Sequence, residues 1–215
     1  MEDFYFISLY ISYGLLVLAC ISGIIKYSFL GGKEKWYLYY CVFLLLIEIV
    51  TNILIEAFHY KNTSFMYPIF IAGEFFILTT LYIKKLKLSD YWMIPAFILA
   101  SGLLIANQYF TLMNDYIKVI SNIIIVCFAG YTLLQAIKSD KKAHYFLLVD
   151  AFVFMYYSVS VFIFVLQHQL TSLSEKSYFI ILSTNNVLLT IFYSSLIFAF
   201  LQLKNTKHIK NIANY

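Results

Sequence analysis

The sequence is dominated by seven apolar runs, each of a length that crosses a lipid bilayer as an α-helix. A transmembrane helix needs about 20 predominantly apolar residues, and the runs lie at about 4–26, 37–58, 65–83, 91–110, 116–137, 145–167 and 178–203. The chain is 62% hydrophobic and only 12% charged, whereas soluble proteins average about 25% charged residues. We therefore predict an all-α polytopic membrane protein, in which residues 1–215 form a single transmembrane domain, a seven-transmembrane-helix bundle.

The lysines are divided unevenly between the two sets of alternate connections. One set, with the C-terminal segment, contains Lys26, Lys33, Lys35, Lys84, Lys85, Lys87, Lys138, Lys141, Lys142, Lys204, Lys207 and Lys210; the other contains Lys61, Lys118 and Lys176. Because lysines concentrate in cytoplasmic loops, we predict an outside N-terminus and a short basic cytoplasmic tail at 204–215. The predicted location is the plasma (inner) membrane, multi-pass. The net charge of +4 is then a topology signal, and no nucleic-acid partner is expected.

Acidic residues inside two of the apolar runs are the strongest functional candidates. Glu48, Asn52, Glu56 and His59 recur at spacings of four, four and three, which places them within an arc of about 80° on one helix. A carboxylate at the bilayer centre costs about 2.5–3.5 kcal/mol, and Glu74 lies near the middle of the next run. Protonation, a shared cation or a water-filled cavity would each offset this cost.

No lysine lies in the central part of any run, so we expect neither Glu48 nor Glu74 to have a cationic partner at its own depth. The two glutamates should then share an interior chamber. Polar residues on other runs complete a predicted ligand- or ion-binding pocket in the outer half of the bundle: Glu48, Asn52, Glu56, His59, Tyr67, Glu74, Asn122, Tyr157, Asn186 and Thr190. The alternative is that these groups only hydrogen-bond the helices together. Asp150 is expected to lie near the cytoplasmic end, within reach of interfacial water.

Several known seven-helix architectures share this topology, and particular residues argue against most of them. Retinal proteins need a lysine in the seventh helix, and ceramidase-like hydrolases need a pair of histidines in the last helix; the run 178–203 has neither. No Pro-Gln pair of the PQ-loop transporters is present. Receptors coupled to G proteins match in topology only. The three cysteines lie inside apolar runs, so we predict no metal site, no disulfide framework and no cofactor.

The chain resembles a group of small, uncharacterised bacterial seven-helix integral membrane proteins over nearly its whole length. The resemblance is carried by the absence of arginine, the aromatic-rich composition, the pair Glu48…Asn52 and the segment Tyr67-Pro68…Gly73-Glu74-Phe75. It implies the fold and no particular activity.

The leading hypothesis for function is a non-enzymatic integral membrane sensor or accessory module with this polar pocket. It would bind a small molecule or cation and act through a separate cytoplasmic or membrane partner. The alternative is a proton- or cation-coupled small-solute transporter, or an oligomeric pore, that uses Glu48 and Glu74. A third hypothesis is an intramembrane lipid-modifying enzyme that uses Glu56 and His59; on balance the residues argue against catalysis.

Overall fold

The computed structural model describes residues 2–109, 114–138, 145–170 and 175–203. Within these ranges the chain forms seven α-helices, two short 3-10 helices and no strand, which confirms the all-helical prediction. The helices are α1 (Glu2–Ile25), η1 (Tyr27–Phe29), α2 (Lys35–Glu56), α3 (Met66–Lys85), η2 (Asp90–Trp92), α4 (Met93–Tyr109), α5 (Asn114–Lys138), α6 (Tyr145–Leu170) and α7 (Glu175–Leu201). The predicted basic tail, 204–215, lies outside the described residues.

Each α-helix overlaps one predicted run, and six of the helices in the described ranges are long and apolar enough to cross a membrane. This indicates a membrane-embedded protein. The exception is the fourth helix, whose apolar segment, Asp90–Ala106, is shorter than the other six. Its α-helical part has 17 residues, or about 26 Å of helix against a hydrocarbon thickness of about 30 Å.

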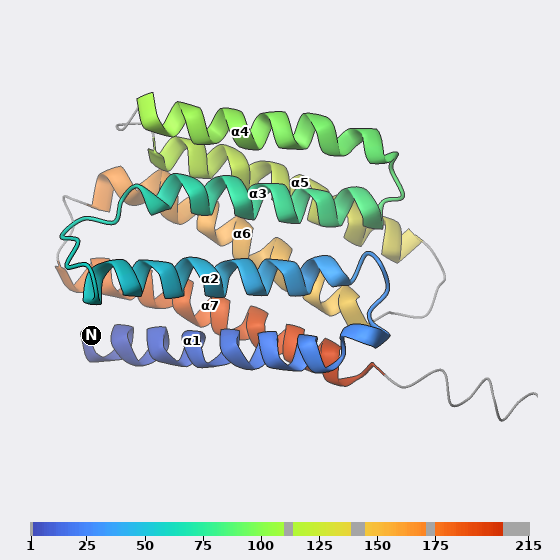
Figure 1. Ribbon diagram of the computed structural model, residues 1–215, viewed down its shortest axis with the longest axis horizontal. Coiled ribbons are helices and arrows are strands. Elements are labelled where there is room, and N and C mark those ends of the chain that lie inside the picture. Colours follow the sequence, from blue (N-terminus) through green and yellow to red (C-terminus); the bar gives the residue numbers. More distant parts are fainter. Residues whose placement is uncertain (1, 110–113, 139–144, 171–174, 204–215) are drawn as a thin grey trace, which may run out of the picture.

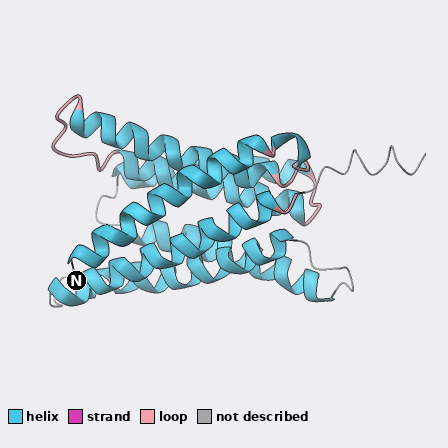
Figure 2. Ribbon diagram, turned by 90° about the horizontal axis from the view of Figure 1, so that it is seen from below, coloured by secondary structure: helices cyan, strands magenta, loops and turns pink. Residues whose placement is uncertain are grey.

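The helices extend along one long axis, and their connections gather at the two ends of the bundle (Figures 1 and 2). Six of them form a closed ring in which each packs on its two neighbours, in the order α1, α2, α3, α5, α6, α7 and back to α1. In Figure 1, α1, α2 and α3 form the front layer, and α7, α6 and α5 lie behind them. α4 stands outside the ring and packs mainly on α3.

Large aromatic side chains are prominent inside the ring. Its largest fully buried side chains include Tyr37, Tyr40, Tyr82, Tyr157 and Phe192. Many Ile, Leu and Phe side chains instead point outward, as expected where the surrounding solvent is lipid. Tyrosine suits this interior because its ring packs like a hydrophobic group while its hydroxyl can hydrogen-bond a buried charge.

Small residues let the helices approach closely at two points. A Cβ atom at Gly23 of α1 would lie 2.7 Å from Leu38 Cδ1, and one at Gly73 of α3 would lie 2.2 Å from Phe43 Cζ. Both positions therefore admit a facing side chain of α2 into the space that a larger residue would occupy. The contact at Gly73 draws α2 and α3 together one residue before Glu74.

Candidate functional site

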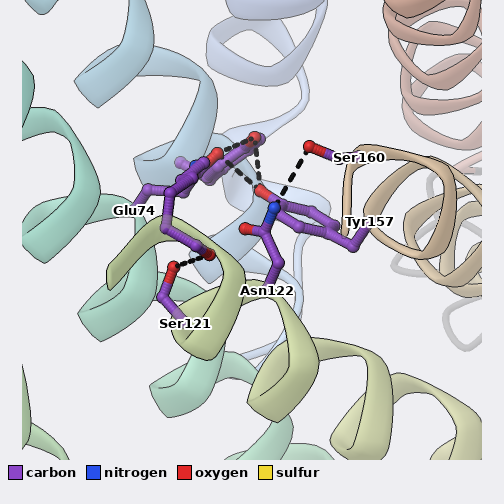
Figure 3. A network of polar contacts seen from close by, with 7 residues as sticks. Glu74, Ser121, Asn122, Tyr157 and Ser160 are labelled. Carbon is purple, nitrogen blue, oxygen red and sulfur yellow. Dashed lines mark hydrogen bonds and ion pairs between the residues drawn. The ribbon is translucent and has the colours of Figure 1, made fainter. Parts of the chain in front are cut away.

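Glu74 is the centre of a buried polar network to which three other helices contribute (Figure 3). Its side chain forms an ion pair with Lys118 of α5, whose ammonium group donates to Oε2. The hydroxyl of Tyr157, from α6, donates to Oε1 at 2.6 Å, and that of Tyr40, from α2, donates to the same oxygen at 3.3 Å. The two hydroxyls lie 3.0 Å apart. Both carboxylate oxygens of Glu74 therefore have donors, as burial of a charge requires.

The prediction that Glu74 has no cationic partner at its depth is wrong, and so is the placement of Lys118 in an outer connection. Lys118 is 2% exposed, and its ammonium group lies 4.5 Å from the ring centroid of Phe70. The backbone of Lys118 lies one turn after the start of α5, and α5 packs on α3. Because lysine has a long flexible stem, its charge lies far from its backbone position, and the backbone position is all that a sequence pattern reports.

A cavity of about 190 Å³ adjoins this network. It lies among five helices of the ring, and its lining residues are Leu9, Ser12, Tyr13, Leu16, Tyr40, Leu44, Glu48, Phe70, Glu74, Tyr156, Asn186, Leu189 and Tyr193. Glu48 and Glu74, from α2 and α3, thus share one chamber. Of the ten residues predicted to form the pocket, the cavity brings together Glu48, Glu74 and Asn186.

Glu48 has a different environment from Glu74. It is half-buried, and Tyr13 of α1 is its hydrogen-bonding neighbour. Among the described residues no lysine or histidine forms an ion pair with it. The cavity wall therefore contains one carboxylate that Lys118 neutralises and one that no described cation neutralises. Asn186 links α7 to α1, because its side-chain amide donates a hydrogen bond to Ser8 Oγ at 3.3 Å.

Four other predicted pocket residues lie in the ring but do not line the cavity. Tyr157 belongs to the Glu74 network, and the buried Asn122 donates to Ser160 Oγ at 3.1 Å, which links α5 to α6 (Figure 3). Tyr67 is half-buried on α3 with its ring beside Phe70. Thr190 is half-buried on α7, where its backbone carbonyl accepts from Ser194 Oγ at 2.7 Å.

The remaining three predicted residues, Asn52, Glu56 and His59, are exposed at the end of α2 and beyond it. Asn52 and Glu56 lie on the last two turns of the helix, and His59 follows it with φ of 54°. A shared helix face did not bring them into the interior with Glu48. Near a helix end polar side chains can reach the membrane surface, so their polarity requires no internal partner. Nothing in the structure favours the acid–base pairing of Glu56 with His59.

A second buried ion pair lies at the C-terminal end of α3. Lys85 pairs with Asp150 of α6, and Tyr37 of α2 donates to the same aspartate. The Lys85 ammonium group also donates to the Tyr37 hydroxyl at 2.8 Å. Asp150 is 1% exposed, so the expectation that it reaches interfacial water is wrong. Asp150 does lie near one end of α6, as predicted, but the neighbouring helices of the ring bury it at that position.

The two networks share three helices, α2, α3 and α6. α3 supplies Glu74 and Lys85, which are eleven residues and therefore about three turns apart on one face. α2 supplies Tyr40 and Tyr37, and α6 supplies Tyr157 and Asp150, so each helix contributes one residue to each network. Sequence reasoning missed Lys85, Lys118, Tyr37 and Tyr40. The spacing of three between the two tyrosines was the available signal, since it places both on one helix face.

The arrangement gathers several polar groups in a small space. Two carboxylates, an amide and several tyrosines converge on a small cavity, and within the described ranges no group of three His, Cys, Asp or Glu residues could hold a metal ion. Comparison of the chain with protein-family models, curated proteins and solved structures gives no match.

Proposed function

We propose that this protein is a non-enzymatic membrane sensor or accessory module that binds a small polar ligand in the cavity and acts through a separate partner. The observation that supports this proposal is the convergence of Glu48 and Glu74, from different helices, on one chamber of about 190 Å³. Ligand sites in membrane proteins are expected where intramembrane ionisable residues face a cavity between helices.

A ligand in this cavity would contact helices that reach both ends of the bundle. The lining residues come from α1, α2, α3, α6 and α7, and the connections next to α2 and α3 contain Lys26, Lys33 and Lys87. A ligand shifts a conformational equilibrium only by its difference in affinity for the two states. Occupancy would therefore be transmitted if the bound ligand draws α1 and α7 toward α2 and α3.

We further propose that the chain crosses the plasma membrane seven times, with its N-terminus outside. The N-terminus and the end of α7 lie at opposite ends of the bundle (Figure 1). With Lys118 paired to Glu74 and Lys85 paired to Asp150, Lys61 and Lys176 remain toward the N-terminal end, against eleven lysines toward the other end and in the tail. The asymmetry that favours a cytoplasmic location for the lysine-rich end is thus greater than the sequence count suggested.

Cysteine labelling of intact cells tests this orientation. In a background with Cys20, Cys41 and Cys127 replaced by alanine, Asn62→Cys should react with a membrane-impermeant maleimide added outside. Ser89→Cys should react only after the membrane is permeabilised, because it follows α3 at the lysine-rich end. The reverse pattern would contradict the proposed orientation, and labelling of both sites from outside would contradict a crossing by α3, which lies between them.

A thermal-shift screen of the purified protein against small polar solutes tests ligand binding. We expect at least one solute class to raise the melting temperature, and we expect Leu189→Trp to abolish that response because Leu189 lines the cavity. Val187→Trp is the matched control, since it places the same ring on the exposed face of the same helix. Glu48→Gln supplies a second test if Leu189→Trp folds poorly. A response that survives in both cavity variants, or no response to any solute, would rule out the cavity as the site.

A proton- or cation-coupled carrier is the second candidate, and the two ion-pair networks favour it. They place titratable groups at two depths along one face of α3, and one of them adjoins the cavity. Proteoliposomes distinguish the candidates: a carrier shows solute-dependent proton flux that Glu74→Gln abolishes, whereas a sensor binds the same solute without flux.

A further inference from the structure

The charge of the cavity wall restricts the ligand that it can accept; this inference rests on the proposed function. Two carboxylates line the cavity, and none of the described lining residues is a lysine or histidine. Glu74 is already neutralised by Lys118, which approaches it from α5, and α5 contributes no lining residue. The wall therefore presents one unneutralised acid, Glu48. Because an ionised carboxylate within a membrane-spanning segment is disfavoured without a counter-charge, a monovalent cation is the complementary ligand.

The aromatic part of the wall favours an organic cation over a metal ion. Tyr13, Tyr40, Phe70, Tyr156 and Tyr193 all line the cavity, and rings that surround a small site are the usual means of recognising ammonium groups. Hard inorganic cations instead need several oxygen ligands.

The protein already binds its own ammonium groups in this way at two places. Lys118 lies between the carboxylate of Glu74 and the ring of Phe70, at 4.5 Å from the centroid. Lys85 lies between the carboxylate of Asp150 and the ring of Tyr37, at 5.1 Å. Each site combines one acid with an aromatic ring, and Glu48 with Tyr13 and the neighbouring tyrosines provides the same combination.

We propose that the cavity binds a small monovalent organic cation with a primary or methylated ammonium group, for which Glu48 is the counter-charge. The size of the cavity sets an upper limit on the ligand. Its volume of about 190 Å³ is below the about 300–1,000 Å³ of sites for drug-sized molecules. A compound with a single ammonium head and a short chain fits this limit.

Choline and its uncharged isostere 3,3-dimethyl-1-butanol provide the test, because they have the same shape and differ in charge. Binding is measured by calorimetry and thermal shift on the full chain in dodecyl maltoside, a detergent without charge or ammonium groups. Choline should bind at least tenfold more tightly than the isostere. Glu48→Gln should weaken choline binding at least tenfold, whereas Glu2→Gln, the same change at an exposed position, should leave it unchanged.

Two further measurements separate the ring contribution and the failure modes. Tyr193→Phe should retain choline affinity, and Tyr193→Leu should lower it several-fold. Equal binding of choline and the isostere, or binding of sodium ion in place of choline, would overturn the cation proposal. If choline is inert but another solute responds in the screen and loses its effect in Leu189→Trp, the cation proposal fails while the proposed function stands. If no solute responds, both fail.

Discussion

Lys118→Met should lower the free energy of unfolding by about 3–5 kcal/mol, since removal of one partner of a buried ion pair leaves the other charge uncompensated. Glu74 is 1% exposed, and with Lys118 gone its carboxylate retains only the hydroxyls of Tyr40 and Tyr157 as donors in the network. Methionine keeps the length and volume of the lysine stem, so the loss reports the charge rather than a cavity. Equilibrium unfolding in mixed detergent micelles, followed by tryptophan fluorescence, measures it.

The double variant Lys118→Met with Glu74→Gln is the matched control for this prediction. Glutamine can still accept the tyrosine hydrogen bonds through its amide oxygen, and it carries no charge. We therefore expect the double variant to recover most of the stability that the single variant loses, because neutral packing often replaces a buried ion pair at little net cost. Lys61→Met, in an exposed connection, should change stability by less than about 0.5 kcal/mol. A single-variant loss no larger than that of Lys61→Met would show that Lys118 and Glu74 are not paired in the interior.

Lys85→Met should also cost about 3–5 kcal/mol, and more than Asp150→Asn. Asp150 has a short side chain and is 1% exposed, so it cannot reach water when Lys85 is lost. Lys85 lies at the end of α3 and its side chain is 10% exposed, so a lysine left without its aspartate can extend toward the membrane surface. The same unfolding measurement compares the two variants.

The neighbouring lysine supplies the control for Lys85. Lys84 pairs with Asp90 at 2.7 Å, but Asp90 is 70% exposed, and a pair of that kind contributes about 0–1 kcal/mol. Lys84→Met should therefore have a small effect although it removes the same charge one residue away. Equal losses for Lys84→Met and Lys85→Met would contradict the buried position of the Lys85–Asp150 pair.

The two ion pairs also explain how this chain tolerates acids in apolar helices. Glu74 and Asp150 are each held by a lysine and by tyrosine hydroxyls. The Glu74 network joins four helices, α2, α3, α5 and α6. The Asp150 network joins three, α2, α3 and α6. These networks account for most of the buried charge in the described ranges. Glu48 differs from Glu74 and Asp150 because no described lysine or histidine forms an ion pair with it. A ligand is therefore expected at Glu48 rather than at Glu74.

The helical runs and the depth of the acids could be predicted because both depend on position along the chain. A segment of about 20 apolar residues crosses a bilayer whatever its neighbours are, and the seven predicted runs overlap α1 to α7. The shared helix face of Glu48, Asn52 and Glu56 could also be predicted, but its orientation could not, and Asn52 and Glu56 are exposed. Which side of α2 faces the ring depends on the packing of Tyr37, Tyr40 and Cys41 against other helices.

The primary sequence alone specified a helical membrane bundle, its repeated spans and the presence of acids within them, because hydrophobic length and charge are properties of single segments. The partners of those acids followed from the folded arrangement. Lys118 meets Glu74 and Lys85 meets Asp150 because the ring places α3 between α5 and α2, with α6 the second helix along from it, beyond α5. Long lysine stems then carry the charge several ångströms from the backbone, a displacement that depends on neighbouring helices and has no signature in the spacing of residues.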